Sequence, residues 1–363
     1  MDSRERTFLA LDHQEPDRVP VDFWASARVW EKLRAATGLS RQQFLDAHDV
    51  DLRYIDGPAY VGPPLKRFHD GSAADLWGVR RRTVRVEVSG GVEEYEEVVE
   101  PPLAGATTVE QVESYAGWPS ADWFDYRAIE GQCDAERARG RVVVLMGDRL
   151  NRIAQLKPAM YLRGVEQILI DLVLNREIAH AVLSRIRRFY CAYAERVFHH
   201  ARGKVDILLT GDDFGSQNGP LVSPSTWEEF LGEGFKEYVG IAKAAGARVM
   251  HHTCGSVRPI IPMMIERGLD VLQSLQPEAA GMEACTLKAE FGQRLSFHGG
   301  VSVQSTLPRG TPQEVRAEVK DRAEALAPGG GYILCTSHNI QADVPLANIE
   351  ALLTAYRDFG RYA

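Results

Sequence analysis

Two residues that can bind metals stand two positions apart in the stretch 248–256. His252 and Cys254 follow an apolar run that predicts a short buried strand, and Gly255 suits a sharp turn after it. On a strand, residues i and i+2 share a face with Cα atoms roughly 6–7 Å apart. Both side chains can therefore reach one zinc ion at about 2.0–2.3 Å. The alternative is a buried cysteine beside a hydrogen-bonded histidine, and a third ligand from elsewhere in the chain would favour the metal.

The composition excludes several classes of protein. The chain has 363 residues, 45% of them hydrophobic, and a formal net charge of -8, which argues against a nucleic-acid surface. Its five cysteines are widely spread and odd in number, so a disulfide framework is not expected and a reducing compartment is favoured. The N-terminus lacks the apolar core of a signal peptide, and no apolar run approaches the ~20 residues needed to span a bilayer. We expect a cytoplasmic protein that binds neither nucleic acid nor membranes.

Eight apolar runs, mostly alternating with helical segments, predict an α/β fold. The predicted strands are 18–24, 51–55, 141–146, 205–210, the start of 248–256, 270–274, 294–298 and 332–335. Eight parallel strands close into a (β/α)8 barrel of the TIM type, whereas an open doubly wound sheet usually has five or six. We therefore predict one such barrel over residues 1–363.

One segment interrupts this alternation after the second strand. Residues 80–99 alternate β-branched and charged side chains around Gly90-Gly91, a pattern typical of a β-hairpin. Because its faces are heavily charged, we interpret residues 79–103 as an inserted flap outside the barrel core.

Polar residues recur where the predicted strands end, and TIM-type barrels carry their chemistry at this end. They are Asp56, Asp148, Asp212, Asp213, His252, Cys254, His298 and His338. Of the two neighbouring aspartates, we expect one to accept backbone N–H groups as a cap and the other, Asp213, to face the cavity. Gln217 and Asn218 fit cavity lining and loop equally well. His298 fits the orientation of a ligand and a hydrogen bond to a backbone carbonyl equally well.

With these strand ends laid out, the chain resembles the uroporphyrinogen decarboxylase superfamily. That group includes porphyrinogen decarboxylases and zinc-dependent, corrinoid-linked methyltransferases. The resemblance covers nearly the whole chain and lies in Arg4-Glu-Arg, Glu15-Pro-Asp-Arg-Val-Pro20, Gly211-Asp-Asp-Phe-Gly-Ser-Gln217, Phe297-His-Gly-Gly-Val301 and Pro345-Leu-Ala-Asn-Ile-Glu350. Together these motifs are specific to the superfamily and not to one reaction.

The first strand departs from the decarboxylase pattern. The decarboxylases carry an R-Q-A-G-R segment there, whose arginines bind substrate carboxylates. The corresponding stretch here is Phe23-Trp-Ala-Ser-Ala-Arg28, which keeps Arg28 alone. Asp56 stands where the decarboxylases place their pyrrole-binding aspartate. The missing anion clamp favours the methyltransferase branch, which carries H-x-C after the fifth strand, as in His252-Thr-Cys254.

The methyltransferases carry a further metal-binding cysteine after the eighth strand. Alignment on Pro345 places His338 in that position, with Cys335 three residues earlier, where a straight strand would turn it to the opposite face. The resemblance thus implies a zinc site completed by His338, our first choice, or by Cys335. A fourth position is open to Gln276 or Glu278.

The resemblance implies a zinc-dependent methyltransferase that moves a methyl group between a small methylated substrate or thiol and a corrinoid (cobalamin) carried by a partner protein. The alternatives are a decarboxylase of a porphyrinogen or smaller acid and a non-catalytic ligand-binding barrel. Catalytic roles are assigned to Asp56, Asp213, Gln217 and His298. Substrate-binding roles are assigned to Trp24, Asp148, Asn218 and Asn339. The oligomeric state is left open.

Overall fold

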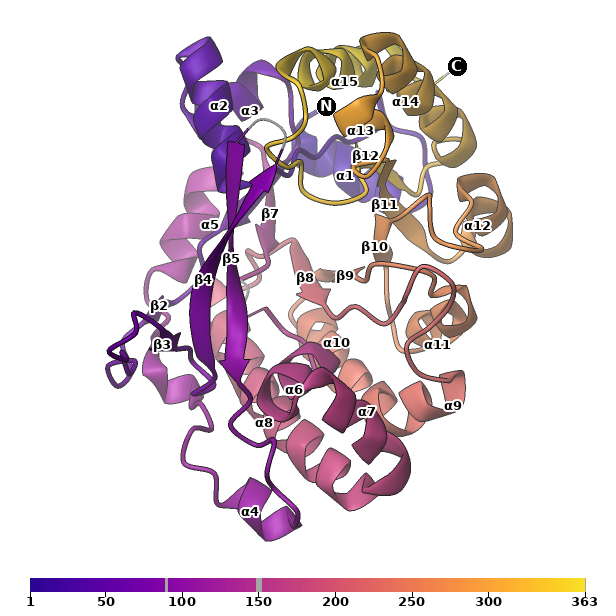
Figure 1. The fold of residues 1–363 in the computed structure, drawn as a ribbon. Coiled ribbons are helices and arrows are strands. Elements are labelled where there is room, and N and C mark those ends of the chain that lie inside the picture. Colours follow the sequence, from indigo (N-terminus) through magenta and orange to yellow (C-terminus); the bar gives the residue numbers. More distant parts are fainter. Residues whose placement is uncertain (89–90, 148–151, 363) are drawn as a thin grey trace.

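Seven parallel strands form one curved sheet in the order β1-β7-β8-β9-β10-β11-β12 (Figure 1). The computed structural model describes residues 1–88, 91–147 and 152–362. The strands are β1 (Leu52–Ile55), β7 (Val142–Leu145), β8 (Ile207–Gly211), β9 (Arg248–His252), β10 (Val271–Leu275), β11 (Ser296–Val301) and β12 (Tyr332–Thr336). The α/β fold of the TIM type predicted from the sequence is confirmed, with one difference in the first strand.

The predicted strand 18–24 does not form a regular strand. Val21 makes a parallel bridge with Leu334 of β12, and the N–H of Asp51, just before β1, donates to the Val21 carbonyl at 2.8 Å. Residues 18–24 therefore lie between β12 and β1, the two edges of the seven-stranded sheet, and we call them the closing segment. Pro20 has no N–H to donate, which explains why pairing here is limited to single bridges.

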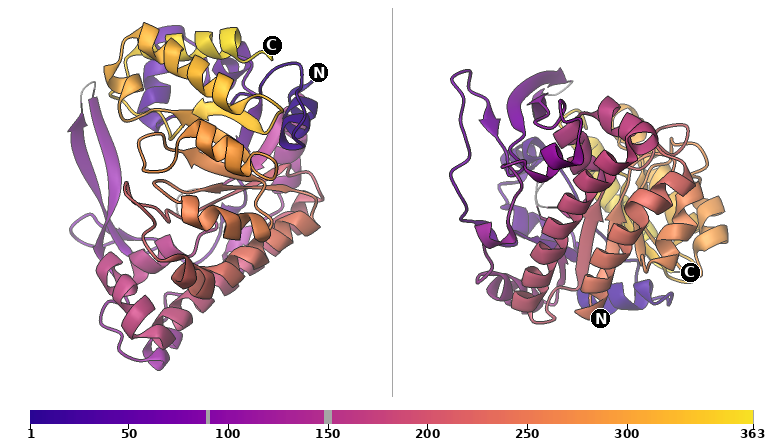
Figure 2. Two further views of the ribbon diagram at one scale, coloured as in Figure 1. Left: turned by 90° about the vertical axis from the view of Figure 1, so that its right-hand side faces the viewer. Right: turned by 90° about the horizontal axis from the view of Figure 1, so that it is seen from below.

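Helices cover the outside of the sheet (Figure 2). They are α1 (Ser3–Leu11), α2 (Ala27–Thr37), α3 (Arg41–Ala47), α4 (Val109–Glu113), α5 (Ile129–Arg137), α6 (Leu156–Arg163), α7 (Val165–Leu174), α8 (Arg176–Ala201), α9 (Pro224–Trp227), α10 (Glu233–Ala244), α11 (Ile261–Glu266), α12 (Ala284–Phe291), α13 (Thr306–Arg309), α14 (Pro312–Leu326) and α15 (Leu346–Phe359). Three consecutive helices, α6, α7 and α8, span residues 156–201, with a break between the first two at Gly164, whose φ is 89°. No helix among the described residues has the length and apolar character needed to cross a membrane.

The interior of the sheet carries a layer of apolar side chains from neighbouring strands. Its members are all almost fully buried: Leu52, Val142, Val144, Ile207, Leu209, Met250, Val271 and Ile333. Because strand residues two apart share a face, His252 and Gln273 stand one step nearer the carboxyl ends than Met250 and Val271. The apolar layer thus forms the floor beneath a polar layer.

The segment after β1 contains an antiparallel pair, β4 (Arg80–Val88) and β5 (Gly91–Glu100), beside the barrel (Figure 1). Shorter strands β2 (Ala59–Tyr60), β3 (Ala73–Ala74) and β6 (Phe124–Asp125) accompany it. Gly90 of the predicted turn lies outside the described residues. Glu93 joins the pair to the barrel, because its carboxylate accepts the Ala342 N–H at 2.8 Å and the Ser26 hydroxyl at 3.2 Å.

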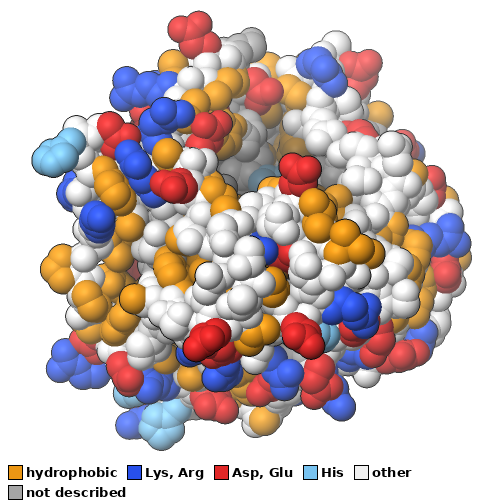
Figure 3. All heavy atoms as spheres, turned by 60° about the horizontal axis from the view of Figure 1, so that its bottom comes forward, with side chains coloured by type: hydrophobic (Ala, Val, Ile, Leu, Met, Phe, Trp, Pro, Cys, Tyr) orange, Lys and Arg blue, Asp and Glu red, His pale blue; other side chains and the backbone are white. Residues whose placement is uncertain are grey.

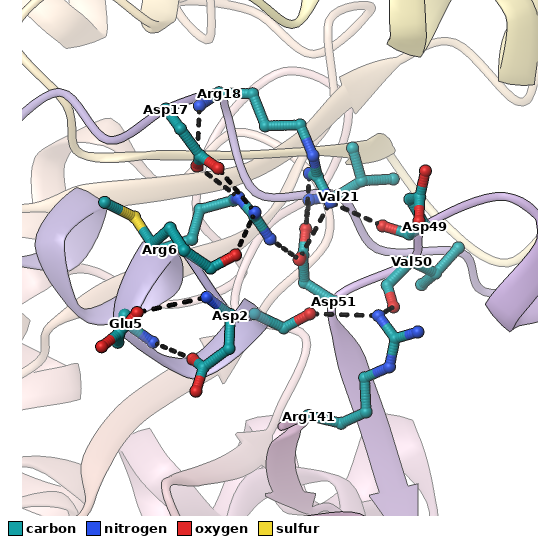
Figure 4. Close-up of polar contacts among 12 residues, drawn as sticks. Asp2, Glu5, Arg6, Asp17, Arg18, Val21, Asp49, Val50, Asp51 and Arg141 are labelled. Carbon is teal, nitrogen blue, oxygen red and sulfur yellow. Dashed lines mark hydrogen bonds and ion pairs between the residues drawn. The ribbon is translucent and has the colours of Figure 1, made fainter. Parts of the chain in front are cut away.

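A buried carboxylate holds the closing segment at the amino-terminal end of the strands (Figure 4). Asp51 is fully buried and accepts hydrogen bonds from Arg6 at 2.7 Å, from Arg18 at 2.7 Å and from the Val21 N–H at 2.7 Å. Arg6 also donates to the partly exposed Asp17. One side chain therefore ties α1, the closing segment and β1 together.

Candidate metal site

Three side chains with metal-binding atoms meet at the carboxyl ends of β9 and β12. His252 ends β9, Cys254 follows it, and His338 lies just beyond β12. One ligand atom from each lies within 4.8 Å of the others, and Cys254 Sγ is 3.5 Å from His252 Nε2. Two imidazole nitrogens and a thiolate are a donor set that zinc accepts, with a fourth position left open.

Close backbone packing fixes the loop that carries Cys254. A Cβ atom on Gly255 would lie 2.6 Å from the backbone of Gly215, and one on Gly215 would lie 2.7 Å from the Cys254 carbonyl oxygen. Gly255 also has a φ of 82°, which an L side chain rarely adopts. Only glycine fits at these two positions, so the loops after β8 and β9 lock together.

The loop after β8 places Asp213 beside the three donors. Its Oδ1 lies 3.7 Å from His252 Nε2 and accepts the Cys254 N–H at 3.1 Å, while its Oδ2 accepts from Lys157 at 2.5 Å. Burial alone would raise the pKa of Asp213, but the Lys157 ammonium and the Cys254 N–H hold it below its ordinary value. Asp213 therefore presents an ionised carboxylate to the site.

The neighbouring Asp212 points into the protein and caps a helix. Its carboxylate accepts the N–H groups of Gln155, Leu156 and Lys157 at the start of α6. Burial raises its pKa to about 6, against the opposing effect of these hydrogen bonds. The capped helix precedes Asp212 in the chain, which only the tertiary structure reveals.

Burial sets the protonation of the three donors. It raises the pKa of Cys254 to about 12, with a further contribution from Asp213. It lowers the pKa of His252 and of His338. Both imidazoles are therefore neutral at pH 7, as metal ligation requires. The thiol keeps its proton until a cation favours the thiolate, so the donor set fits zinc.

The second ring nitrogen of His252 has a partner of its own. Nδ1 lies 2.9 Å from the side-chain oxygen of Gln273, which only accepts hydrogen bonds. The Nδ1–H therefore donates to Gln273, and the Nε2 lone pair faces Cys254. Histidine ligands in metal sites are commonly oriented by such a bond.

Trp24, which the closing segment supplies, packs on both histidines. Its ring is stacked on His338 with centroids 5.1 Å apart, and it meets His252 edge-on at 5.6 Å. The Arg152 guanidinium lies 5.8 Å from the same indole ring. Trp24 thus forms one wall of the site.

A cavity of about 60 Å³ adjoins His252. Its lining residues are Trp77, Arg152, Ala154, Lys157, Pro158, Tyr161, Tyr190, Gly211 and His252. Pockets for drug-sized ligands measure roughly 300–1,000 Å³, so this space admits only a group of a few atoms. On the face drawn in Figure 3 the surface is hollowed, and a histidine side chain (pale blue) is visible in the hollow.

The alternative ligand, Cys335, lies away from this cluster. It is inside β12, fully buried, and grouped with Asp22 and His298. Burial raises its pKa well above the ordinary value. His298 is paired with a carboxylate rather than a backbone carbonyl, because its Nε2 lies 2.9 Å from Asp22 Oδ2. The structure brings His338, and not Cys335, to the H-x-C pair.

Three residues expected in catalysis or substrate binding lie at the rim. Asp56 is exposed directly after β1, and Gln217 and Asn218 are exposed in the loop after β8. Gln217 accepts a hydrogen bond from Gln276 at 3.2 Å, and the oxygen of Gln276 accepts the Gly255 N–H at 2.9 Å. Gln276 thus supports the ligand-bearing loop through the backbone.

The remaining expected residues are Glu278, Asn339 and Asp148. Glu278 accepts from the hydroxyls of Ser302 and Ser305, so its carboxylate is engaged elsewhere. Asn339 follows His338 and accepts from Gln341 at 3.4 Å. Asp148 lies outside the described residues.

Sequence patterns did not single out Arg152, Lys157 or Gln273. Arg152 and Lys157 follow β7, and TIM-type barrels carry their catalytic residues at this end of the strands. Their position after a predicted strand was the signal in the sequence that could have identified them. In the sequence, Gln273 lies inside an apolar predicted strand, and this position indicates a core residue. Its contact with His252 depends on the register between β9 and β10.

Comparisons with known proteins agree with this architecture. Residues 154–359 match the family model described as Uroporphyrinogen decarboxylase (URO-D). The chain matches none of the curated proteins with which it was compared. A solved methyltransferase from Methanosarcina mazei is similar, with a TM-score of 0.67, 18% identity and 99% of each chain covered. A D-psicose 3-epimerase from Clostridium cellulolyticum H10 has a TM-score of 0.38, with 10% identity over 70% of this chain and 88% of its own.

Proposed function

This chain belongs to the uroporphyrinogen decarboxylase (URO-D) family, and we propose that it is a zinc-dependent methyltransferase within it. The observation that carries this proposal is the convergence of His252, Cys254 and His338, whose ligand atoms lie within 4.8 Å of one another. The likeness along the whole chain to a solved structure named as a methyltransferase supports it. A buried thiol with a pKa near 12 is a poor nucleophile by itself, which also favours a metal at this site.

His252, Cys254 and His338 would hold the ion. Zinc bound there would supply Lewis acidity, which favours a thiolate over a thiol and polarises an oxygen or nitrogen that carries a methyl group. Lys157 and the Cys254 N–H hold the Asp213 carboxylate beside His252. From that position Asp213 can orient an incoming thiol or hydroxyl group by accepting a hydrogen bond from it.

The transfer itself exchanges one bond for another at the methyl carbon. A nucleophile forms a bond to this carbon while the bond to the leaving group breaks, and the electron pair stays on the leaving group. The cavity of about 60 Å³ favours a small substrate, and Trp24 shields the two histidines on one side. We propose that the corrinoid is carried by a partner protein.

Metal analysis tests the site directly. Elemental analysis after dialysis should find about one zinc per chain, and Cys285→Ser, which changes an exposed cysteine, should leave that ratio unchanged. Zinc-loaded protein should move a methyl group between methylcobalamin and a small thiol, or between a small methylated substrate and reduced cobalamin. A metal-free protein with undiminished methyl transfer would contradict the proposal.

A porphyrinogen assay tests the main alternative. A substrate with many carboxylates needs several cationic partners. Arg28 is the one arginine left from the decarboxylase clamp, and its half-exposed side chain pairs with Glu31. We expect no decarboxylation of uroporphyrinogen, and turnover at an enzymatic rate would move the chain to the decarboxylase branch.

A further inference from the structure

We propose, on the basis of the metal site proposed above, that Asp22, His298 and Gln273 form a relay that fixes which ring nitrogen of His252 carries the proton. The relay keeps His252 Nε2 available as a ligand. These three are positioning residues, since they act on the site only through His252.

The strand register places the relay in one layer of the barrel. His252 of β9 pairs with Gln273 of β10, which in turn pairs with His298 of β11. All three side chains are buried, at 3%, 0% and 0% exposed. Neighbouring strands lie about 4.8 Å apart, so consecutive members of this row are within reach of each other. Asp22 comes from the closing segment and contacts the far end of the row.

Asp22 sets the direction of the hydrogen bonds at that end. Its Oδ2 accepts from the Tyr54 hydroxyl at 2.6 Å and lies 2.9 Å from His298 Nε2, and its Oδ1 accepts the Phe23 N–H at 2.8 Å. Burial raises the pKa of Asp22, but the bonds from His298, Tyr54 and Phe23 lower it overall. An ionised carboxylate only accepts hydrogen bonds, so the His298 proton is on Nε2. The relay that we propose uses His298 with this one ring proton, so that its Nδ1 is an acceptor.

The same logic applies at the metal end. The Gln273 side-chain oxygen lies 2.9 Å from His252 Nδ1, which makes this nitrogen the donor and leaves Nε2 with a lone pair toward Cys254. Gln273 then turns its NH2 group away from His252. If the amide were reversed, the NH2 group would face Nδ1 and the His252 proton would move to Nε2, where it blocks metal binding.

The two ends of the proposed relay carry complementary atoms, a donor on Gln273 and an acceptor on His298. Gln273 Nε2, a donor, and His298 Nδ1, an acceptor, are buried and have no hydrogen-bond partner within the part of the chain that the structure describes. A buried donor or acceptor without a hydrogen-bond partner is unfavourable. Gln273 and His298 are paired neighbours on β10 and β11, and a hydrogen bond between these two atoms would complete the chain from Asp22 to His252 that we propose.

Histidine tautomers in the metal-free protein test the relay without relying on zinc. Long-range proton–nitrogen NMR spectra of 15N-histidine-labelled protein should show the proton of His252 on Nδ1 and that of His298 on Nε2. In Gln273→Leu, His252 should become a mixture of tautomers. The same exchange in Gln132→Leu, which removes a partly buried amide that binds the Gly57 backbone, should leave the His252 signal unchanged. A wild-type His252 protonated on Nε2 would overturn the relay.

Zinc affinity gives the second readout, measured by competition with a chelator. Gln273→Leu should weaken zinc binding by about 10–100-fold, the range for residues that orient ligands. Asp22→Asn should weaken it in the wild type but not further in the Gln273→Leu background, because the relay is then already interrupted. Equal effects of Asp22→Asn in both backgrounds would mean that it acts through packing, and would overturn the proposal. A wild-type protein that binds no zinc would refute the metal site, while the tautomers would still test the relay.

Discussion

At the scale of single residues, the third ligand decides how sulfur-rich the metal site is. His338 lies with His252 and Cys254, whereas Cys335 is sealed inside β12. We expect His338→Ala to lower zinc affinity by at least the ~10–100-fold seen for residues that only orient ligands. Cys335→Ser should leave the affinity nearly unchanged. A chelator titration on both variants measures the difference.

The opposite result would have a clear meaning. If Cys335→Ser lost zinc while His338→Ala kept it, β12 would have to end earlier and present Cys335 to the cluster. The site would then hold two sulfurs, and a thiol acceptor would become the preferred substrate.

A second residue-scale prediction concerns acid stability. The pKa of Asp22 is lowered in the folded protein, so its carboxylate stabilises the fold above the unfolded-state pKa of about 3.9. This contribution disappears as the pH falls through the lower, folded-state pKa. Asp22→Asn should therefore cost most stability near pH 7, and the difference in free energy of unfolding from wild type should shrink below about pH 4. Urea unfolding between pH 3 and pH 7 measures it, and a difference that grows toward low pH would contradict the assignment.

The sequence alone identified those site residues that stand in a local pattern. His252 and Cys254 were identifiable because residues i and i+2 share a face at a strand end. The choice between His338 and Cys335 depended on where the last strand stops, and the structure ends β12 at Thr336. Gln273 could not be identified, since its function comes from a neighbouring strand.

At the scale of elements, the apolar runs predicted seven of the barrel strands, and the closing segment was the exception. The apolar pattern of residues 18–24 does not show that Pro20 limits strand pairing. It also does not show that the Asp51 side chain accepts the Val21 N–H in place of a hydrogen bond between strands. Nor does periodicity reveal that Gly164 divides one helical region. These features depend on contacts between residues distant in sequence or on backbone angles.

The anchor of the closing segment gives an element-scale prediction. Asp51→Ala would leave the largely buried Arg6 and Arg18 without their shared carboxylate, and loss of one partner of a buried pair costs about 3–5 kcal/mol. Asp17→Ala is the matched control, because Asp17 binds the same Arg6 but is 43% exposed, and exposed pairs contribute about 0–1 kcal/mol. Chemical denaturation of the two variants compares them. Equal losses would show that the burial of Asp51 is not what holds the segment.

At the scale of the whole molecule, the metal donors stand above a core that is complete without them. The apolar layer below His252 is formed by residues from six of the seven strands of the sheet, all except β11, and α1 packs against it through Leu11. His338 and Cys254 lie beyond the strand ends, and close backbone packing fixes the loop that carries Cys254. The same separation is common in TIM-type barrels, where one end of the strands carries stability and the other carries chemistry.

This separation predicts what removal of the metal does. The chelated protein should keep its far-ultraviolet circular dichroism and a cooperative thermal transition, because the core does not depend on the ion. Zinc at 100 times its dissociation constant should add about 2.7 kcal/mol of stability, since it binds the folded state alone. For a domain of this size that corresponds to a rise in Tm of several degrees, which scanning calorimetry with and without chelator detects. His338→Ala should show little of this rise at the same zinc concentration. A chain that unfolds when the ion is removed would instead identify the cluster as a structural site.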